Sequence, residues 1–372
     1  MNFNKAFVHA FIPASHSTFP AFFSLSKALR FLIILFLIFE INRVLYVSVF
    51  CKAGYKESLK KILLVCTTLL SFFLFFEGVF SFIAKSHQQW ASLAQNNWRY
   101  FFHQGQNSLG YRDKPVLTED ISKRKIVVVG DSFTAGDGLK NVAHRFSEKL
   151  ESRLPDSYRV FNLGIAGNST TDSYKELANF PHKPDVIVLQ YFGTNMLEEY
   201  NLKKNVTFSR GNPFTQLNFV QKALVQYSYL LNYVYFYVLP MNRAVAEEFR
   251  SVFLESYRNE KIMESHLNDL NQFVELSKKT GISLIVVLFP FLNDASNVSQ
   301  VYMKPIESFF EGKNIPTLNV SDLISEIPLR KRTVHKRDSN PSALVHKKVG
   351  EELYRMIKKI AFRSMWVDDE SM

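Results

Sequence analysis

The stretch VVVGDSFTAGDG, residues 127–138, decides the fold expected for this chain of 372 residues. Its valines end a short apolar run, and Gly130, Asp131 and Ser132 follow directly. A near-continuous run of β-branched residues is typical of a strand buried on both faces of a parallel sheet. A serine at the end of such a strand, before a glycine-bearing turn, can present its hydroxyl to a bound carbonyl group. We therefore predict a strand that carries a nucleophile, Ser132, at its carboxyl end.

Four further runs of this kind lie along the chain, separated by segments with helical periodicity. This alternation predicts an α/β fold, a three-layer sandwich around a five-stranded parallel sheet. The last helix is expected to be capped by Asn340, with Pro341 in its first turn. The expected strands are residues 125–130, 159–164, 185–193 and 282–290, with a weaker fifth at 315–320, and the expected helices are residues 142–153, 170–179, 260–280 and 341–362.

Small polar residues follow these strands at their carboxyl ends, where open parallel sheets bind ligands. Attack by Ser132 on a carbonyl would create an oxyanion. The backbone N–H groups of Ser132 and Gly164 and the side-chain amide of Asn195 are suitable donors to it. Asp338 and His346 lie beyond the fifth strand. Each signal alone is common at strand ends of any α/β fold, so the prediction depends on the convergence of four of them on one edge.

The first part of the chain carries two long apolar runs. Residues 61–84 are the main candidate for a transmembrane helix, because at 1.5 Å per residue they span roughly 36 Å, against a hydrocarbon core of about 30 Å. Residues 28–50 are a second candidate, a span or an interfacial helix, since polar residues interrupt them at positions 40, 42 and 43. Lysines at positions 52, 56, 60 and 61 favour a cytoplasmic loop before residues 61–84, whereas Lys27 and Arg30 favour the opposite orientation if residues 28–50 also span. We therefore expect a cell-membrane protein whose remaining chain is extracytoplasmic.

These patterns divide the chain into four parts. Residues 1–85 form a membrane region, 86–120 a connecting segment, 121–362 the α/β domain and 363–372 a C-terminal tail. Residues 196–258 interrupt the strand–helix rhythm as an insertion. Its Tyr-rich stretch, residues 219–240, is expected to be an aromatic core helix or, alternatively, a lid or acyl-chain surface.

Composition narrows the classes of partner. The net charge of +11 comes from Lys and Arg residues spread along the chain, without a zinc-finger or RNP-like pattern, so no nucleic-acid partner is expected. Both cysteines, Cys51 and Cys66, lie in or beside the apolar N-terminal region, which indicates neither a disulfide framework nor a metal site. We expect no metal and no organic cofactor.

Three of these segments also resemble the blocks of a known family, the GDSL or SGNH hydrolases, over roughly residues 107–362. GDSFTAGDG resembles the first block, FNLGIAGNST the second and YFGTN the third, and NSLGYRDKP (107–115) resembles the lead-in of membrane-anchored members. The resemblance implies a flavodoxin-like sandwich with ester hydrolysis or acyl transfer as its chemistry. It also implies Ser132 as nucleophile and Gly164 and Asn195 as oxyanion donors. The expected substrate is an acylated small molecule, an envelope glycan or a lipid.

The last block, RDSNPSALVHKK, departs from the family pattern. Asp338 and Pro341 fit, but Asn340 stands where the family has its base histidine, and an amide cannot take the serine proton as a neutral imidazole does. Three explanations remain open. Another histidine, His346 or His335, serves as base; the domain is weakly active; or it is a binding module that kept the fold without turnover.

Overall fold

The computed structural model describes residues 27–47, 57–83, 98, 102, 107–205, 217–238, 241–293, 298–335 and 338–369. The chain forms two compact units. Unit 1 contains Met1–Phe101 and Asn212–Val245, and unit 2 contains Phe102–Gly211 and Ala246–Met372. Residues 212–245, part of the segment expected as an insertion, thus fall in the same unit as the N-terminal helices.

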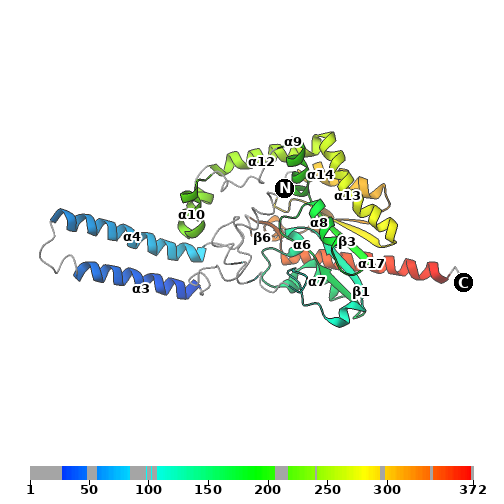
Figure 1. Cartoon of the computed structure of the whole chain (residues 1–372), viewed down its shortest axis with the longest axis horizontal. Coiled ribbons are helices and arrows are strands. Elements are labelled where there is room, and N and C mark those ends of the chain that lie inside the picture. The colour runs from blue at the N-terminus through cyan, green and yellow to red at the C-terminus, as the bar shows by residue number, and fades with distance from the viewer. Residues whose placement is uncertain are drawn as a thin grey trace. The chain divides into compact units, whose positions relative to one another are not determined.

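Unit 2 is built on a five-stranded parallel sheet (Figure 1). Its strand order is β2-β1-β3-β4-β5, the flavodoxin-like order, which confirms the predicted sheet. Val127 lies in register with Phe161 on one side and Ile187 on the other. The strands are β1 (Arg124–Val129), β2 (Tyr158–Asn162), β3 (Val186–Phe192), β4 (Ser283–Phe289) and β5 (Thr317–Asn319).

Helices cover both faces of this sheet, because its strands present apolar side chains to both. Val127 and Val129 pack into one core, whereas Ile126 and Val128 pack into the other. This alternation of successive side chains is what a strand in a three-layer sandwich requires. The first core is closed by α8 (Thr170–Ala178), the end of α12 (Met241–Arg258), α13 (Glu260–Thr280) and α14 (Gln300–Glu311), and the second by α7 (Phe146–Glu151), α15 (Val320–Ile324) and α17 (Ala343–Asp369).

Two expected helices differ from the structure at their starts. The last one begins at Ala343, and Asn340 and Pro341 belong to strand β7 (Asp338–Pro341). This strand pairs antiparallel with β6 (Thr333–His335), and the two strands form a hairpin ahead of the last helix. Asn340 is therefore not a helix cap, because its side chain bonds Asp338 instead.

The helix expected at residues 142–153 is two elements. A 3-10 turn, η4 (Val142–His144), precedes α7, and Arg145 between them has an extended backbone (φ −70°, ψ 156°). Unit 2 also contains three short helical elements: η3 (Thr118–Ile121), α9 (Leu197–Lys204) and α16 (Leu329–Arg332).

Unit 1 contains two long apolar helices, α3 (Lys27–Leu45) and α4 (Glu57–Ile83), which pack against each other. Asn42 Nδ2 donates to Ser71 Oγ at 3.0 Å, and a side chain at Gly78 would meet the ring of Phe31. Of the described helices, α4 is the one long and apolar enough to cross a membrane, over Leu59–Phe82 with a mean hydropathy of 2.2. Positions 52 and 56 and most of segment 86–120 lie outside the described residues.

The Tyr-rich stretch of the insertion also belongs to unit 1. It forms α10 (Phe219–Tyr227), α11 (Tyr229–Tyr233) and a π-helical turn, η7 (Val234–Val238). The unit boundary at residues 245 and 246 falls within α12.

Candidate active site

Ser132 is the first residue of α6 (Ser132–Ala135), directly after the carboxyl end of β1. Asp131 caps this short helix, because its Oδ1 accepts the N–H of Phe133 at 2.9 Å. Gly136 ends it with a left-handed backbone (φ +70°), a conformation that glycine adopts without steric cost. Ser132 is partly exposed, whereas the next three residues are buried. The turn thus presents one hydroxyl at the sheet edge, as the sequence predicts.

Gln190, in the middle of β3, anchors the turn from below. Its Oε1 accepts the N–H of Asp131 and the hydroxyl of Thr134, both at 3.0 Å. A Cβ at Gly130 would lie 2.4 Å from the same oxygen, so only glycine leaves room for this contact. Gln190 is not among the site residues expected from the sequence. Its signal is an amide inside an otherwise apolar strand, since a buried polar group requires a partner.

The second block holds the turn from the side of β2. Asn162 Nδ2 donates to Thr134 O at 2.8 Å, and a Cβ at Gly164 would lie 2.4 Å from Ala135 N. Gly164 is therefore required for the close approach of two backbones. Its own N–H, expected to face an oxyanion, donates to Asn162 Oδ1 at 3.0 Å in this structure.

The third block forms η5 (Gly193–Met196) at the end of β3. Asn195 is buried, and its Nδ2 donates to Asn168 O at 3.3 Å, which ties the third block to the second. The Asn195 amide, expected from the sequence to donate to an oxyanion, is thus bonded to the loop that follows Gly164.

A buried chain of side chains fixes the start of η5. Tyr257 donates its hydroxyl proton to Gly193 O at 2.6 Å, and its oxygen lies 2.6 Å from the Tyr191 hydroxyl. Tyr191 must then donate to Tyr257, so the nitrogen of His266 2.8 Å away, Nε2, carries a proton and donates to Tyr191. Burial lowers the pKa of His266 to about 3, so this ring is neutral. The chain positions the loop that bears Asn195.

The fourth block reaches the turn through β7, which contacts α6. Asp338 is buried, and its Oδ1 accepts the backbone N–H of Asn340 at 2.9 Å and the Asn340 amide at 2.8 Å. Burial raises the pKa of Asp338 to about 7, with the negative charge of Asp137 adding to the effect. Asn340 therefore makes the contact to the carboxylate that a base histidine would make, without the ability to take up a proton.

The two candidate histidines lie in different environments. His346 is fully buried on α17, where its Nδ1 accepts the N–H of Phe146 at 3.1 Å and its ring stacks on the Phe146 ring. Burial lowers its pKa to about 3, helped by the positive charges of Arg145 and His144. His335 lies directly opposite Asp338 in the β6–β7 hairpin. Opposite residues of an antiparallel pair share a face, so the hairpin brings His335, and not His346, toward Asp338.

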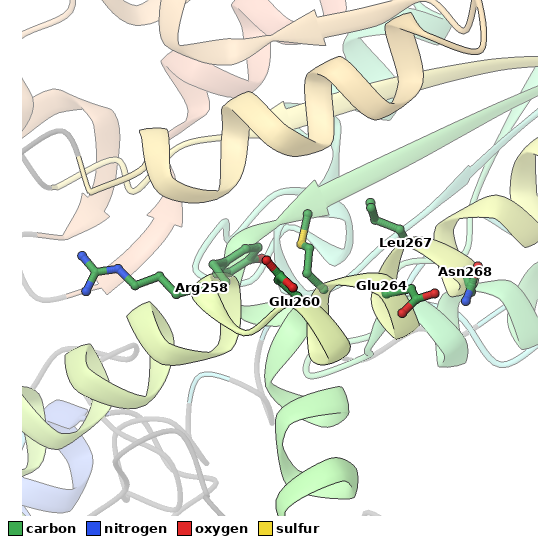
Figure 2. A pocket seen from close by; sticks show the side chains of 7 residues that line it. Arg258, Glu260, Glu264, Leu267 and Asn268 are labelled. Atoms are coloured by element: carbon green, nitrogen blue, oxygen red, sulfur yellow. The ribbon is translucent and has the colours of Figure 1, made fainter.

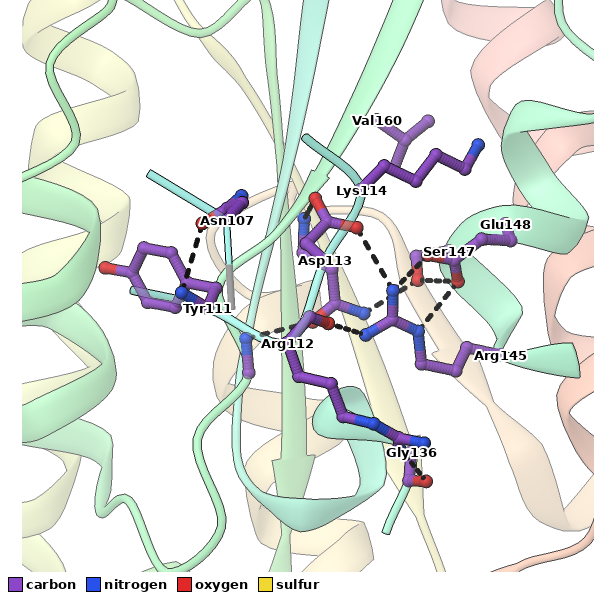
Figure 3. A network of polar contacts seen from close by, with 12 residues as sticks. Asn107, Tyr111, Arg112, Asp113, Lys114, Gly136, Arg145, Ser147, Glu148 and Val160 are labelled. Atoms are coloured by element: carbon purple, nitrogen blue, oxygen red, sulfur yellow. Dashed lines mark hydrogen bonds and ion pairs between the residues drawn. The ribbon is translucent and has the colours of Figure 1, made fainter. Parts of the chain in front are cut away.

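The lead-in segment 107–115 supports the back of the Ser132 turn through Arg112 (Figure 3). Its guanidinium donates to three carbonyl oxygens that follow the nucleophile: Ala135 O at 3.1 Å, Gly136 O at 2.8 Å and Leu139 O at 2.6 Å. Because Arg112 is buried in the low-dielectric interior of the protein, these hydrogen bonds are stronger than the same bonds would be in water. They fix the exit of the turn.

Arg145 extends this network toward α7 (Figure 3). It is wholly buried and pairs with Glu148 and, at 3.1 Å, with Asp113, and it also donates to the carbonyl of Arg112. Asp113 in turn accepts the N–H of Asn162 at 3.2 Å. Burial raises the pKa of Asp113 to about 6 although the arginines oppose the shift. The lead-in and the second block are thus locked to one another beneath the turn.

A pocket lies elsewhere, at the corner between α12 and α13 (Figure 2). Its lining contains Arg258, Glu260 and Glu264, and none of the strand-end residues described above. Tyr257 also lines it and donates to Gly193, but no ligand chemistry follows from its open, mixed lining.

The fold and its turn define a class: a flavodoxin-like α/β sandwich with a serine at the end of the first strand. Solved structures with a similar chain path include a protein described as lipolytic and of the G-D-S-L family from Desulfitobacterium hafniense, which is 18% identical over 63% of this chain and 99% of that one, with a TM-score of 0.36. A lipase/acylhydrolase from Enterococcus faecalis is 18% identical over 63% and 96% of the two chains, with a TM-score of 0.35. An acetyl xylan esterase is 14% identical over 63% and 99%, with a TM-score of 0.36. No family model and no curated protein sequence matches the chain.

Proposed function

We propose that this chain is a membrane-anchored ester hydrolase or acyltransferase of the SGNH type, with Ser132 as its nucleophile. The observation that supports this most is the convergence of four separate segments on the α6 turn. Gln190, Asn162, Arg112 and strand β7 each contact it, and the turn leaves one hydroxyl partly exposed. A turn held this rigidly suits a nucleophile, because catalysis requires reacting groups in fixed positions.

The residues of this chain suit acyl transfer step by step. Ser132 Oγ attacks the ester carbonyl carbon, its proton passes to a base, and the carbonyl oxygen becomes an oxyanion. The N–H groups of Ser132 and Gly164 and the Asn195 amide donate to this oxyanion. The Gly164 N–H must then turn from Asn162 Oδ1, its partner in the free structure. Collapse expels the alcohol, which takes the proton from the base and leaves an acyl ester on Ser132. Water or a second hydroxyl then loses its proton to the base and attacks this ester, and Ser132 Oγ leaves and takes the proton back.

His335 is the base that we propose, with Asp338 as its orienting acid. Support comes from the hairpin register, which sets His335 across from Asp338. The protonated imidazole formed during attack would be stabilised by the ionised carboxylate. Because burial holds the pKa of Asp338 at about 7, this support is complete only above neutral pH.

A second function, binding of an acylated molecule without turnover, is favoured by one observation. Asn340 already occupies the contact to Asp338, at 2.8 Å, that would orient an imidazole at this position. A domain with an oxyanion site and no base would retain an acylated ligand and hydrolyse it slowly. In serine hydrolases that lack their catalytic triad, an oxyanion site and substrate binding alone still accelerate the reaction about 10³–10⁴-fold over its rate in water.

Hydrolysis of p-nitrophenyl acetate by matched variants separates these functions. We expect Asn340→His to raise kcat by roughly 10²-fold, because it supplies a general base next to Asp338. We expect His335→Ala to lower the wild-type rate and His346→Gln to leave it unchanged, since glutamine keeps an acceptor for the Phe146 N–H. A wild-type rate that does not depend on Ser132 would contradict the hydrolase proposal and leave binding as the function.

The proposed substrate is an acylated small molecule, an O-acyl glycan of the envelope or a lipid. The proposed location is the cell membrane with unit 2 extracytoplasmic. Support for the location comes from α4, which is apolar over Leu59–Phe82 and has only 11% of its most apolar stretch buried. Lys60 and Lys61 at its start favour a cytoplasmic N-terminal end.

A further inference from the structure

Helix α10 in unit 1 carries an exposed apolar stripe that nothing among the described residues covers. Val220, Leu224 and Tyr227 are 63%, 53% and 54% exposed. At 100° per residue these three side chains fall within an arc of about 60°, so they form one face. Val225 lies outside that arc and is buried, and its carbonyl accepts the amide of Asn232 from α11. We call Val220, Leu224 and Tyr227 the α10 stripe.

A carboxylate of the candidate membrane helix holds this segment in place. Glu77 of α4 accepts three hydrogen bonds at the start of α11, from the Ser228 hydroxyl at 2.7 Å and from the N–H groups of Tyr229 and Leu230. The first N–H groups of a helix have no partner within it. The Glu77 carboxylate supplies acceptors for those of α11 and is itself hydrogen-bonded by them. Phe80, one turn further along α4, packs on the ring of Tyr233 at 4.8 Å. The one acid inside the apolar run is thus explained as a docking residue for the insertion.

The position of Glu77 along α4 sets the depth of that contact. Glu77 lies five residues before Phe82, the end of the apolar stretch, which corresponds to roughly 7.5 Å along the axis. The stretch spans roughly 36 Å and exceeds the hydrocarbon core by several ångströms. Glu77 would therefore lie within the outermost part of the core, close to the headgroups. The docked segment is then at the level where tyrosines and amphipathic helices reside in membranes.

We infer that α10 is an interfacial helix whose stripe inserts into the lipid leaflet beside the anchor helix. This inference rests on the proposed membrane anchoring. A lipid surface, rather than a protein partner, fits because α10 is fixed through α11 to a helix whose large exposed apolar side chains are Phe, Leu, Ile and Val. The stripe and the surface of α4 are then parts of one lipid contact, and the insertion is a second attachment to the membrane.

Site-directed fluorescence on the full chain tests this contact. In a variant with Cys51 and Cys66 replaced by serine, Leu224→Cys is labelled with the dye NBD and the protein is reconstituted in phosphatidylcholine vesicles. Doxyl lipids labelled near the headgroup should quench this dye, and aqueous iodide should not. Ile121→Cys in unit 2 is the matched control, because Ile121 is an apolar side chain of similar exposure, 50%. Its dye should respond to iodide and not to doxyl lipid.

Two further variants make the outcomes distinct. Leu69→Cys, at the middle of α4, reports insertion of the anchor itself, and Glu77→Ala removes the acceptor that docks α11. We expect Glu77→Ala to abolish doxyl quenching at position 224 and to keep it at position 69. Quenching at 69 with iodide access at 224 in the parent would overturn the inference and leave the anchor standing. Absence of lipid quenching at 69 would overturn both.

Discussion

At the scale of single residues, Asn340 is the group that the structure places against Asp338. The amide of Asn340 donates to Asp338 Oδ1, and its own Oδ1 has no hydrogen-bond partner among the described residues. An amide bonds the carboxylate in this way but cannot take up a proton. Under the proposed function, Ser132 therefore depends on His335 for its activation.

The buried carboxyl of Asp338 predicts a pH dependence of stability. Its pKa is raised from the usual value near 3.8 to about 7, so the folded chain holds this proton more tightly than the unfolded chain. The associated stability is present below pH 4 and is lost as the pH rises through 7. Between pH 5 and pH 8 the wild type should lose roughly 2–3 kcal/mol of its free energy of unfolding through this group, and Asp338→Asn should not show this loss. Thermal unfolding of the full chain in detergent across this range measures it.

Asp156→Asn serves as the control, because Asp156 is exposed. Both variants remove one acid, and only the buried one should flatten the profile. Parallel profiles for the wild type and Asp338→Asn would show that Asp338 is ionised in the folded chain at pH 5.

At the scale of elements, the Ser132 turn is rigid because distant segments bond its backbone. Arg112 binds its exit, Asn162 its middle and Gln190 its entrance. Buried polar groups that bond distant segments in this way favour one arrangement of the elements they join. Gly164 completes the support by letting β2's loop approach Ala135 N.

Gly164→Ala tests this support. The added methyl would lie 2.4 Å from Ala135 N, so backbone must move. We expect a loss of about 1–3 kcal/mol in the free energy of unfolding and a large loss of ester hydrolysis. Gly281→Ala is the control, since that glycine has a positive φ of +69° and open space around its Cβ. It should lose stability by about 1 kcal/mol and keep its activity.

The sequence predicts some helices and strands better than others. The buried strands and α13 are predicted closely, because long apolar periodicity specifies them regardless of context. The β6–β7 hairpin is not, since its strands are only three and four residues long and lack a long apolar run. Strand-end residues such as Ser132 and Asn195 are found from their motifs. Gln190 and Arg145 act through bonds to segments far away in sequence, so a local pattern can mark Gln190 as an unusual polar residue but cannot identify the partner of either side chain.

At the scale of the whole molecule, the chain combines an α/β unit, unit 2, with a helical unit, unit 1. Part of the insertion belongs to unit 1. Residues 212–245 leave the sandwich and join the N-terminal helices, where Glu77 binds them. The insertion predicted from broken periodicity is therefore shared between units. Among the described residues, unit 1 thus groups α10 and α11 of the insertion with the apolar helices α3 and α4.

Membrane extraction tests the anchor. We expect the full chain to remain in the membrane pellet after alkaline carbonate treatment. Leu69→Arg combined with Phe72→Arg should release it, because each arginine near the middle of a span costs about 3 kcal/mol. Leu117→Arg, at an exposed position of unit 2, should not. Release of the wild-type chain by carbonate would contradict the anchor.

Labelling by a fluorophosphonate tests whether Ser132 is the nucleophile of an acyl-transfer site. We predict slow labelling of the folded wild-type chain, none of Ser132→Ala, and much faster labelling of Asn340→His. Equal labelling of wild type and Ser132→Ala, or no labelling of either wild type or Asn340→His, would contradict it.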